Sequence, residues 1–407
     1  MAFSKKTHLR YWRMCANILP DAYQSSDASR MFLGFFIVSA FDLLDVPDNQ
    51  GLSGPSLTAE ERQVWIDWIY SCQTPEGHGF RGFTGTDLRT RRTAANKQWD
   101  PGNLPNTFFA LAALLVLGDD LSAVMRQELL QWLPLLQRPD GSFGEILGEH
   151  DVIEGGRDLR YCCCAAGIAY ILHDPRAEPA RSAFNEDRLI DYILSCQDTN
   201  GGFGESPLRE PHSGLNYCAI ATLELLGRLH GPSNRRARAV LDGMDSCVRW
   251  LVDRQTTVLS EEELEVQHGE ADKEAIATAA NLASHPIYYS PPITIIGFNG
   301  RPNKIADTCY SFWSSGALAI LDSLHLADLP PARNYLLMKV QHLIGGFAKG
   351  PGSPPDVLHS YLGLAALSLY GETGIKSLDP ALCISRQAVA NLQNVPWRRD
   401  KPNAGHC

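Results

Sequence analysis

The chain has 407 residues, enough for two or three ordinary domains or one large one. Its hydrophobic share of 44% and charged share of 20% are typical of a globular protein, which argues against a disordered or fibrous chain. The net charge of −10 at pH 7 argues against general nucleic-acid binding, because an acidic surface repels a phosphate backbone.

The sequence shows neither a secretory signal nor a membrane-spanning segment. The first residues, MAFSKKTHLRYWRM, have no apolar stretch after the basic positions. The longest apolar runs, 32–41 and 108–117, are far shorter than the roughly 20 residues that a membrane helix needs. Six of the eleven cysteines lie inside apolar stretches, where free cysteine behaves as a small core residue. We therefore expect a cytoplasmic protein without disulfides.

Two kinds of predicted helix alternate along the chain. Segments that are apolar nearly all round predict helices buried on every side, at 31–44, 107–117, 161–172, 216–226, 309–321 and 357–370. Segments with one apolar stripe predict surface helices, at 62–72, 126–137, 187–197, 245–255 and 333–341. This alternation predicts an inner layer of helices wrapped by an outer layer.

A short phrase recurs where the outer segments end: a glutamine, a polar gap, one or two glycines and a phenylalanine. It occurs at Gln137, Gln197 and Gln341, with a looser copy at Gln73. We interpret the phrase as turn chemistry, because glycine accepts the positive φ that follows a helix. The spacing suits a helical hairpin with its loops. We expect an all-α fold, an α/α barrel (toroid) of about six inner and six outer helices, although an open solenoid has the same periodicity.

The regular pattern is interrupted at 256–296. There an acidic and then proline-flanked stretch separates Gln255 from the next glycine-phenylalanine pair. We expect a surface insertion in a single domain that spans 1–407. Its acidic run at 261–265 could recruit a basic partner, but a solvated charge run is the favoured interpretation.

The segments that enter the inner helices carry polar and charged side chains. Asp307, Cys309 and His359 stand at the starts of two successive inner segments. One carboxylate, one thiolate and one imidazole leave the fourth position of a tetrahedral zinc ion open, as in a catalytic site. Each residue alone also fits an ordinary structural role, because an Asp-x-Cys is common and a histidine at an apolar helix start usually belongs to the core. Their equivalent places in the repeat favour the zinc site.

Cations and a hydroxyl group lie in the same entering segments. They are His212, Arg301, Lys304 and Tyr310. If the inner helices run parallel, their N-termini add positive potential at one end of the barrel. Such a set suits a diphosphate and the charge that develops as it leaves. The alternative is a group of surface cations that never converge. The chain has no GxxxxGK[ST] loop, which argues against a nucleoside triphosphate.

Four segments resemble the β subunits of protein prenyltransferases, most closely those of type I geranylgeranyltransferases. They are DLRYCCCA (158–165), PHSGLNYCAIATLELLG (211–227), GRPNKIADTCYSFW (300–313) and GGFAKGPGSPPDVLHSYLGLAALSL (345–369). The resemblance implies an α/α barrel in which Asp307, Cys309 and His359 bind one zinc ion. The zinc ion would take the cysteine thiol of a protein's C-terminal CaaX motif, often CaaL, as its fourth ligand.

The same resemblance implies roles for other residues and for partners. His212, Arg301, Lys304 and Tyr310 would hold the diphosphate of geranylgeranyl diphosphate, Arg160 would lie near the peptide carboxylate, and Trp313 and Phe36 would line the lipid site. The implied partners are a prenyltransferase α subunit, with which the chain forms a heterodimer, and CaaX proteins such as Rho-type small GTPases.

Two positions bear on the subtype. Lys349 stands where farnesyl relatives carry an aspartate that recruits magnesium, so we expect Mg²⁺ not to be required. Phe32 stands where type I enzymes usually carry a small residue, which keeps a farnesyltransferase β subunit as the alternative. A terpene cyclase is disfavoured because the chain has no DxDD or DDxxD motif. A non-catalytic, peptide-binding helical scaffold would have no reason to place Asp307, Cys309 and His359 together.

Overall fold

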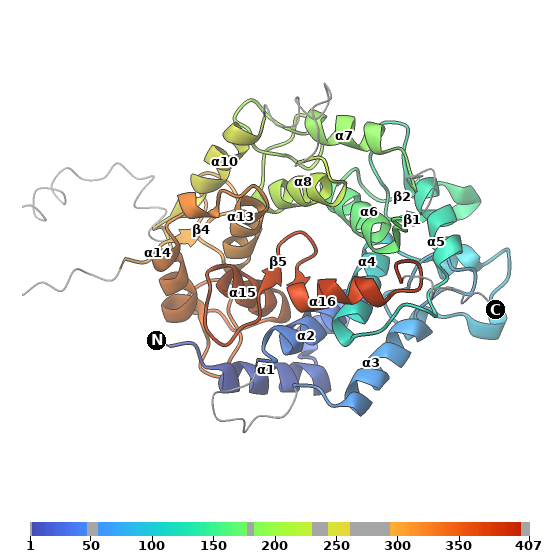
Figure 1. Ribbon diagram of the computed structural model, residues 1–407, viewed down its shortest axis with the longest axis horizontal. Coiled ribbons are helices and arrows are strands. Elements are labelled where there is room, and N and C mark those ends of the chain that lie inside the picture. Colours follow the sequence, from blue (N-terminus) through green and yellow to red (C-terminus); the bar gives the residue numbers. More distant parts are fainter. Residues whose placement is uncertain (1, 47–55, 177–182, 230–242, 261–293, 400–407) are drawn as a thin grey trace, which may run out of the picture.

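Six buried helices form a closed inner ring in the computed structural model, which describes residues 2–46, 56–176, 183–229, 243–260 and 294–399 (Figure 1). They are α2 (Arg30–Leu43), α4 (Leu104–Leu117), α6 (Leu159–Leu172), α8 (Ser213–Leu225), α13 (Thr308–Ile320) and α15 (Val357–Leu369). Each packs against the next, and α15 packs against α2. The fold is therefore an α/α barrel and not an open solenoid, and the six inner helices lie where the sequence predicts them.

An outer ring of helices surrounds the inner one. It consists of α1 (Lys5–Asn17), α3 (Ala59–Ser71), α5 (Arg126–Trp132), α7 (Glu186–Ser195), α10 (Met244–Val252) and α14 (Leu329–Asn334). α5 continues as the 3-10 turn η5 (Leu133–Leu136), where Pro134 interrupts the α-helix, and α14 continues as the π-helical turn η8 (Tyr335–Val340). Five of these helices match the sequence expectation. α1 is an additional outer helix, and it buries His8, Tyr11, Trp12 and Cys15.

The recurring glutamines join each outer helix to the next. Gln137 Nε2 donates to the Asn185 carbonyl at 2.9 Å, and the Asn185 N–H donates to Gln137 Oε1 at 2.9 Å. Equivalent bonds run from Gln73 to 123–125, from Gln197 to Gly243, from Gln255 to Asp328 and from Gln341 to Ala2. The last of these joins the final outer helix to the first. We call this series of bonds the glutamine relay.

The glycines of the same phrase have the structural role expected of them. Gly141, Gly201 and Gly345 have φ values of +95°, +94° and +96°, a conformation that a side chain disfavours. The turn that each glycine makes brings the phenylalanine back to pair with the glutamine, as in the bridge between Gln137 and Phe143. The turn interpretation of the phrase is therefore confirmed at these positions.

Short strands connect the helices at three places. β1 (Ile146–Leu147) pairs with β2 (Ile153–Glu154), and β5 (Leu378–Asp379) pairs with β6 (Ile384–Ser385). β3 (Gln255–Thr256) pairs with β4 (Gly297–Phe298), so the chain between them leaves and returns at one point. Most of the proposed insertion, 261–293 with its acidic run, lies outside the described residues.

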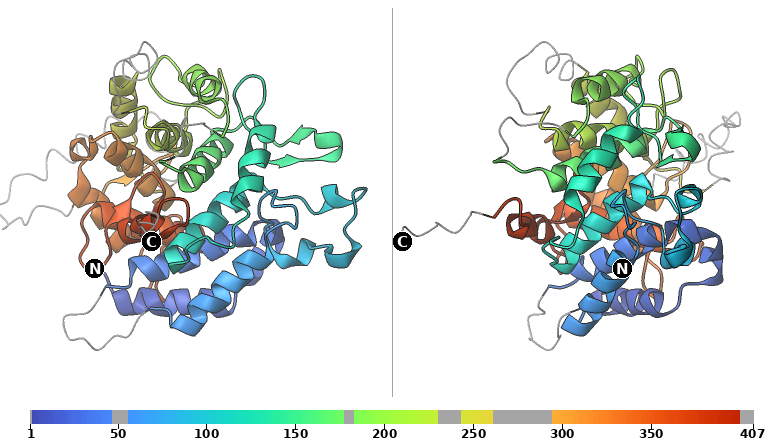
Figure 2. Two further views of the ribbon diagram at one scale, coloured as in Figure 1. Left: turned by 45° about the vertical axis from the view of Figure 1, so that its right-hand side comes forward. Right: turned by 90° about the vertical axis from the view of Figure 1, so that its right-hand side faces the viewer.

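The C-terminal segment crosses one end of the barrel. It comprises β5, β6, α16 (Arg386–Ala390) and the 3-10 turn η9 (Asn391–Asn394), drawn in red in Figures 1 and 2. Asn391 Nδ2 donates to the Leu115 carbonyl at 2.8 Å, and Trp397 Nε1 donates to the Ile171 carbonyl at 3.1 Å. Both carbonyls lie at the C-terminal ends of inner helices. The opposite end, where the inner helices begin, is the end at which the predicted site residues stand.

Ten cysteines of the described residues are free, as expected for a chain without disulfides. In the part of the chain that the structure describes, we find no helix with the length and apolar character that crossing a membrane requires. Further 3-10 turns are η1 (Asp21–Ser29), η2 (Thr84–Thr86), η3 (Arg89–Arg91), η4 (Lys97–Trp99), η6 (Glu149–Asp151) and η7 (Leu324–Leu326).

Candidate functional site

The N-cap residues of the inner helices form the framework of the site. At α4, α6, α8, α13 and α15 a side chain accepts a hydrogen bond from a backbone N–H of the first turn, and these caps are Asn103, Asp158, His212, Asp307 and Asp356. Capping satisfies N–H groups that have no partner within the helix. Since the inner helices start at the same end of the barrel, the caps bring their side chains to one mouth.

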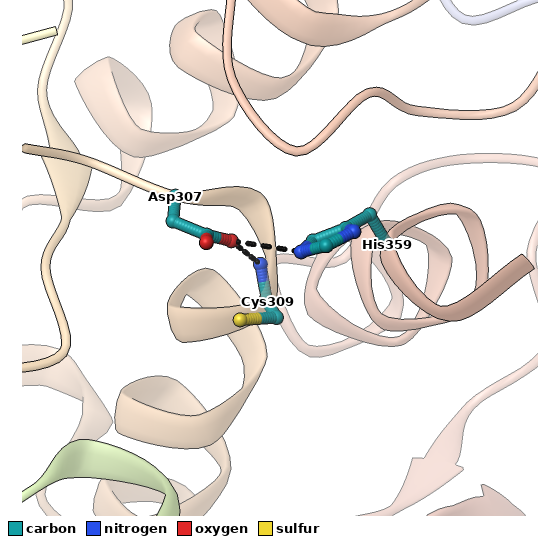
Figure 3. Close-up of side chains that lie close together, drawn as sticks. All are labelled: Asp307, Cys309 and His359. Atoms are coloured by element: carbon teal, nitrogen blue, oxygen red, sulfur yellow. Dashed lines mark hydrogen bonds and ion pairs between the residues drawn. The ribbon is translucent and has the colours of Figure 1, made fainter. Parts of the chain in front are cut away.

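Asp307, Cys309 and His359 lie together at the starts of α13 and α15 (Figure 3). Their ligand atoms all lie within 4.8 Å of one another. His359 Nε2 is 3.1 Å from Asp307 Oδ1, and the Cys309 N–H donates to Asp307 Oδ1 at 2.9 Å. The structure therefore brings together the three residues that the sequence analysis selected as metal ligands.

Asp356 holds the far side of the His359 ring. Its Oδ2 is 2.6 Å from His359 Nδ1, and its Oδ1 accepts the His359 backbone N–H at 2.9 Å. A carboxylate on one ring nitrogen directs the other nitrogen, here Nε2, toward Asp307. The sequence analysis assigned Asp356 no role, although its spacing of three residues before His359 at a helix start is a usable signal.

The charges at the cluster depend on one another. Burial lowers the pKa of His359, but hydrogen bonds to Asp307 and Asp356 outweigh it and raise that pKa to about 9. Burial raises the pKa of Asp307, and the hydrogen bond from His359 outweighs it, so the net shift is downward. Burial and the negative charge of Asp307 raise the pKa of the Cys309 thiol well above its usual value. Oxygen, sulfur and nitrogen donors in one partly buried cluster fit a Zn²⁺ ion, which would favour the thiolate.

His212 and Tyr310 form a second polar group. His212 Nδ1 accepts the Gly214 N–H at 3.1 Å, so the neutral ring carries its hydrogen on Nε2, 3.0 Å from the Tyr310 oxygen. Burial lowers the pKa of His212, and the Arg301 charge lowers it further. The Tyr310 oxygen can accept this bond, which leaves its own O–H free to donate to an anion.

The predicted cations occupy different settings. Arg301 forms an ion pair with Glu210 at 2.8 Å, and Arg160 forms one with Asp158 at 2.5 Å. Lys349 Nζ lies 4.0 Å from Asp307 Oδ2, which connects it to the metal-ligand cluster. Lys304 is exposed, and its side chain has no ion pair with any residue that the structure describes. The structure thus gathers His212, Tyr310 and Arg301, whereas the Lys304 side chain forms no hydrogen bond or ion pair with these three residues.

The predicted lipid-lining residues belong to two separate aromatic groups. Phe32 and Phe36 of α2 have ring centroids 4.3 Å apart, and Phe36 lies 5.0 Å from Tyr361 of α15. Trp313 of α13 instead packs on Tyr217 of α8, at 4.8 Å. Both groups lie on inner helices of the same ring, so their role in lining a lipid site stays a prediction.

Comparison with known proteins agrees with this architecture. Residues 3–384 match the family described as the prenyltransferase alpha-alpha toroid domain. The chain is 33% identical to the geranylgeranyl transferase type-1 subunit beta of Dictyostelium discoideum, over 93% of this chain and 94% of that protein, and 33% identical to the Arabidopsis thaliana subunit of the same name, over 96% and 91%. A protein farnesyltransferase subunit beta from Pyricularia oryzae is 26% identical, over 89% of this chain and 62% of its own length.

A solved structure supports the same relationship. Candida albicans protein geranylgeranyltransferase-I, complexed with GGPP, superposes with a TM-score of 0.76 at 27% identity, over 98% of this chain and 100% of that chain. The match covers both rings of helices. The resemblance seen in the sequence is confirmed, and the chain belongs to the prenyltransferase family of alpha-alpha toroid proteins, as a relative of the type-1 geranylgeranyl transferase β subunits.

Proposed function

We propose that the chain is the β subunit of a zinc-dependent protein geranylgeranyltransferase type I. It transfers a geranylgeranyl group from its diphosphate to the cysteine thiol of a C-terminal CaaX motif. The observation that carries the proposal is the cluster of Asp307, Cys309 and His359 at the mouth of a barrel related to the type-1 β subunits. A zinc ion held there supplies a thiolate at neutral pH, because it lowers the pKa of a coordinated thiol.

The side chains around the cluster prepare the transfer. Asp356 accepts the Nδ1 hydrogen of His359 and so presents Nε2 to the metal. The acceptor sulfur forms a bond to the first lipid carbon as the bond from that carbon to the diphosphate oxygen breaks, and the diphosphate leaves with the electron pair. Tyr310 would donate its O–H to that diphosphate while its oxygen accepts the His212 Nε2 hydrogen, and the positive charge of Arg301 would stabilise the leaving group.

The subtype and partners follow from the same relationship. Lys349 places an ammonium group near Asp307, where it can offset the negative charge of the leaving group without a second metal, so turnover needs no Mg²⁺. The chain works as a heterodimer with a prenyltransferase α subunit in the cytoplasm, on CaaX proteins such as Rho-type GTPases. Lys304 and Arg160 complete the diphosphate and peptide-carboxylate sites by reorienting their exposed side chains.

A farnesyltransferase activity is the second candidate. Phe32 is a bulky side chain in contact with Phe36 and Phe109, at centroid distances of 4.3 and 5.0 Å. If this aromatic group limits the space for the lipid, the shorter farnesyl donor competes with geranylgeranyl diphosphate. A peptide-binding scaffold without activity is the remaining alternative, and it predicts no bound zinc.

The test is to co-express the chain with a prenyltransferase α subunit, remove free metal, and measure bound zinc. Transfer from geranylgeranyl and farnesyl diphosphate to a CaaL peptide is then followed without magnesium. We expect about one zinc per heterodimer and geranylgeranyl transfer. The Cys309→Ala variant should lose zinc. The control variant Cys72→Ala changes a buried cysteine outside the metal-ligand cluster and should keep zinc. Absence of zinc from the unmodified heterodimer would favour the scaffold, and transfer of farnesyl alone would favour the farnesyltransferase.

A further inference from the structure

Residues 84–99 form a projecting segment between the first glutamine turn and α4. The segment contains the turns η2, η3 and η4 and ends just before Asn103, the N-cap of α4. It therefore belongs to the end of the barrel at which the inner helices begin. In the left view of Figure 2 this light-blue segment extends away from the rings, and in the right view the red C-terminal segment lies at the opposite end.

A buried ion-pair network holds the base of this segment. Asp100, which is fully buried, receives ion pairs from Arg81 and Arg92, the latter at 2.7 Å. Arg92 also pairs with Glu76 at 2.8 Å, and Arg81 pairs with Asp87 at 3.3 Å. Buried charges that satisfy one another in this way hold their backbone in one arrangement, because breaking one pair leaves an uncompensated charge. The segment is thus a defined structure and not a loose loop.

The outer surface of the segment carries cations and an exposed tryptophan. Arg89, Arg91 and Lys97 are exposed, and none of them forms an ion pair with a residue in the described ranges. Trp99 is 75% exposed, which is unusual for a large aromatic side chain. The other two arginines near this segment, Arg81 and Arg92, are used in the buried network. Three unpaired cations beside an exposed indole are thus concentrated on one projection of a chain whose net charge is −10.

We propose that residues 84–99 dock the protein on an anionic lipid surface. Tryptophan favours the boundary between water and lipid, because its ring is apolar and its N–H is polar. Arginine and lysine are attracted to acidic headgroups by about 1 kcal/mol each at the membrane surface. A projection meets a flat surface without rearrangement of the barrel. Docking through this segment brings the mouth end of the barrel to the lipid surface.

The hairpin of β1 and β2 opposes the attraction of residues 84–99 to acidic headgroups. Its turn carries the exposed acidic residues Glu149 and Asp151, and it projects from the same side of the barrel in Figures 1 and 2. Like charges on the hairpin and the headgroups repel each other within about 8 to 10 Å at physiological salt. Binding is therefore weak, reversible and sensitive to salt. Neutralising the hairpin by Glu149→Gln with Asp151→Asn should strengthen it.

The experiment measures partition of the heterodimer with an α subunit onto phosphatidylcholine vesicles with and without phosphatidylserine. We expect binding only to the anionic vesicles, lost at high salt. The triple variant Arg89→Gln, Arg91→Gln, Lys97→Gln should reduce the partition coefficient roughly 100-fold. The matched control is Lys6→Gln, Arg10→Gln, Arg249→Gln, which removes the same charge from exposed positions on α1 and α10 and should leave the partition unchanged.

Trp99 reports the orientation. Its fluorescence should shift on binding to anionic vesicles, and Trp99→Ser should remove the shift and weaken the partition. Equal binding of both triple variants, or no binding at low salt, would overturn the proposal. Protection of Trp99 from a soluble quencher in the heterodimer without vesicles would assign the segment to a protein partner instead. Transfer to a soluble CaaL peptide without vesicles should be unchanged in the triple variant, so this test is independent of the proposed function.

Discussion

His8 makes closure of the barrel depend on pH. It lies on α1, between the rings of Phe3 and Phe347, each at a centroid distance of 4.9 Å. Its Nδ1 accepts the Gly346 N–H at 3.1 Å, and its Nε2 lies 3.1 Å from Gln341 Oε1. The neutral ring with hydrogen on Nε2 satisfies both contacts. A proton on Nδ1 would face the Gly346 N–H and remove its acceptor.

The structure sets the size of the effect. Burial lowers the pKa of His8 from 6.5 to about 4, although the hydrogen bond that His8 donates to Gln341 acts in the opposite direction and raises it. The state in which α1 has detached binds more protons than the native state, so stability falls as the pH drops from about 6.5 toward 4. Between pH 7 and pH 5 the free energy of attaching α1 should fall by about 2 kcal/mol, or roughly 20-fold in the opening equilibrium.

Hydrogen exchange of the α1 amides in the heterodimer measures this opening. After correction for the intrinsic pH dependence of exchange, the opening equilibrium should rise roughly 20-fold from pH 7 to pH 5. His8→Gln keeps a donor for Gln341 but does not titrate, so it should open more at pH 7 and lose the pH dependence. The control His150→Gln alters an exposed histidine and should behave like the unmodified chain. An unchanged pH dependence in His8→Gln would refute the reasoning.

Four further predictions concern the site and the ring. Asp356→Asn should weaken zinc binding about 10- to 100-fold in a chelator competition, because His359 loses its orienting carboxylate; unchanged affinity would remove Asp356 from the site. Lys349→Asp should make transfer respond to magnesium, and a magnesium requirement in the unmodified enzyme would contradict the assignment. Phe32→Thr should raise the ratio of geranylgeranyl to farnesyl transfer by about tenfold or more, and an unchanged ratio would show that Phe32 does not select the lipid. Gln341→Ala should lower the free energy of unfolding in urea by about 1 to 3 kcal/mol, whereas Gln98→Ala, which removes only a bond to the nearby Ala95 carbonyl, should have a smaller effect.

The inner helices could be predicted because burial on all sides leaves a strong sequence signal. Segments such as 309–321 and 357–370 contain no Asp, Glu, Lys or Arg, and they coincide with α13 and α15 to within a residue. α1 could not be found in this way. Its buried stripe of Tyr11, Trp12 and Cys15 is interrupted by basic residues, and its partners lie more than 300 positions away in the chain. Only the closed ring shows that it is an outer helix.

The candidate site was predictable to a similar degree. The repeat placed Asp307 and His359 at equivalent helix starts, so their approach followed from the fold. The ion pair of Arg301 with Glu210 and the separation of Trp313 from Phe36 depend on side-chain directions and on contacts between distant segments. Periodicity specifies the face of a helix but not the rotamer of an exposed arginine. For this reason the metal cluster was accessible from the sequence and the arrangement of the surrounding groups was not.

The glutamine relay ties the outer helices into a closed circle, like a hoop around the barrel. Five of its joints use a glutamine, and at the sixth, between α1 and α3, Arg13 binds Glu61 and the Ser56 carbonyl. Widening the ring at any point must break such a joint, so molecules should enter along the axis and not between helices. The joint from Gln341 to Ala2 links residues 339 positions apart, whereas the other glutamine joints link residues 46 to 73 positions apart, so this joint is the one that closes the ring. A bulky fusion placed directly before Ala2 would load that point, whereas one after residue 399 would not.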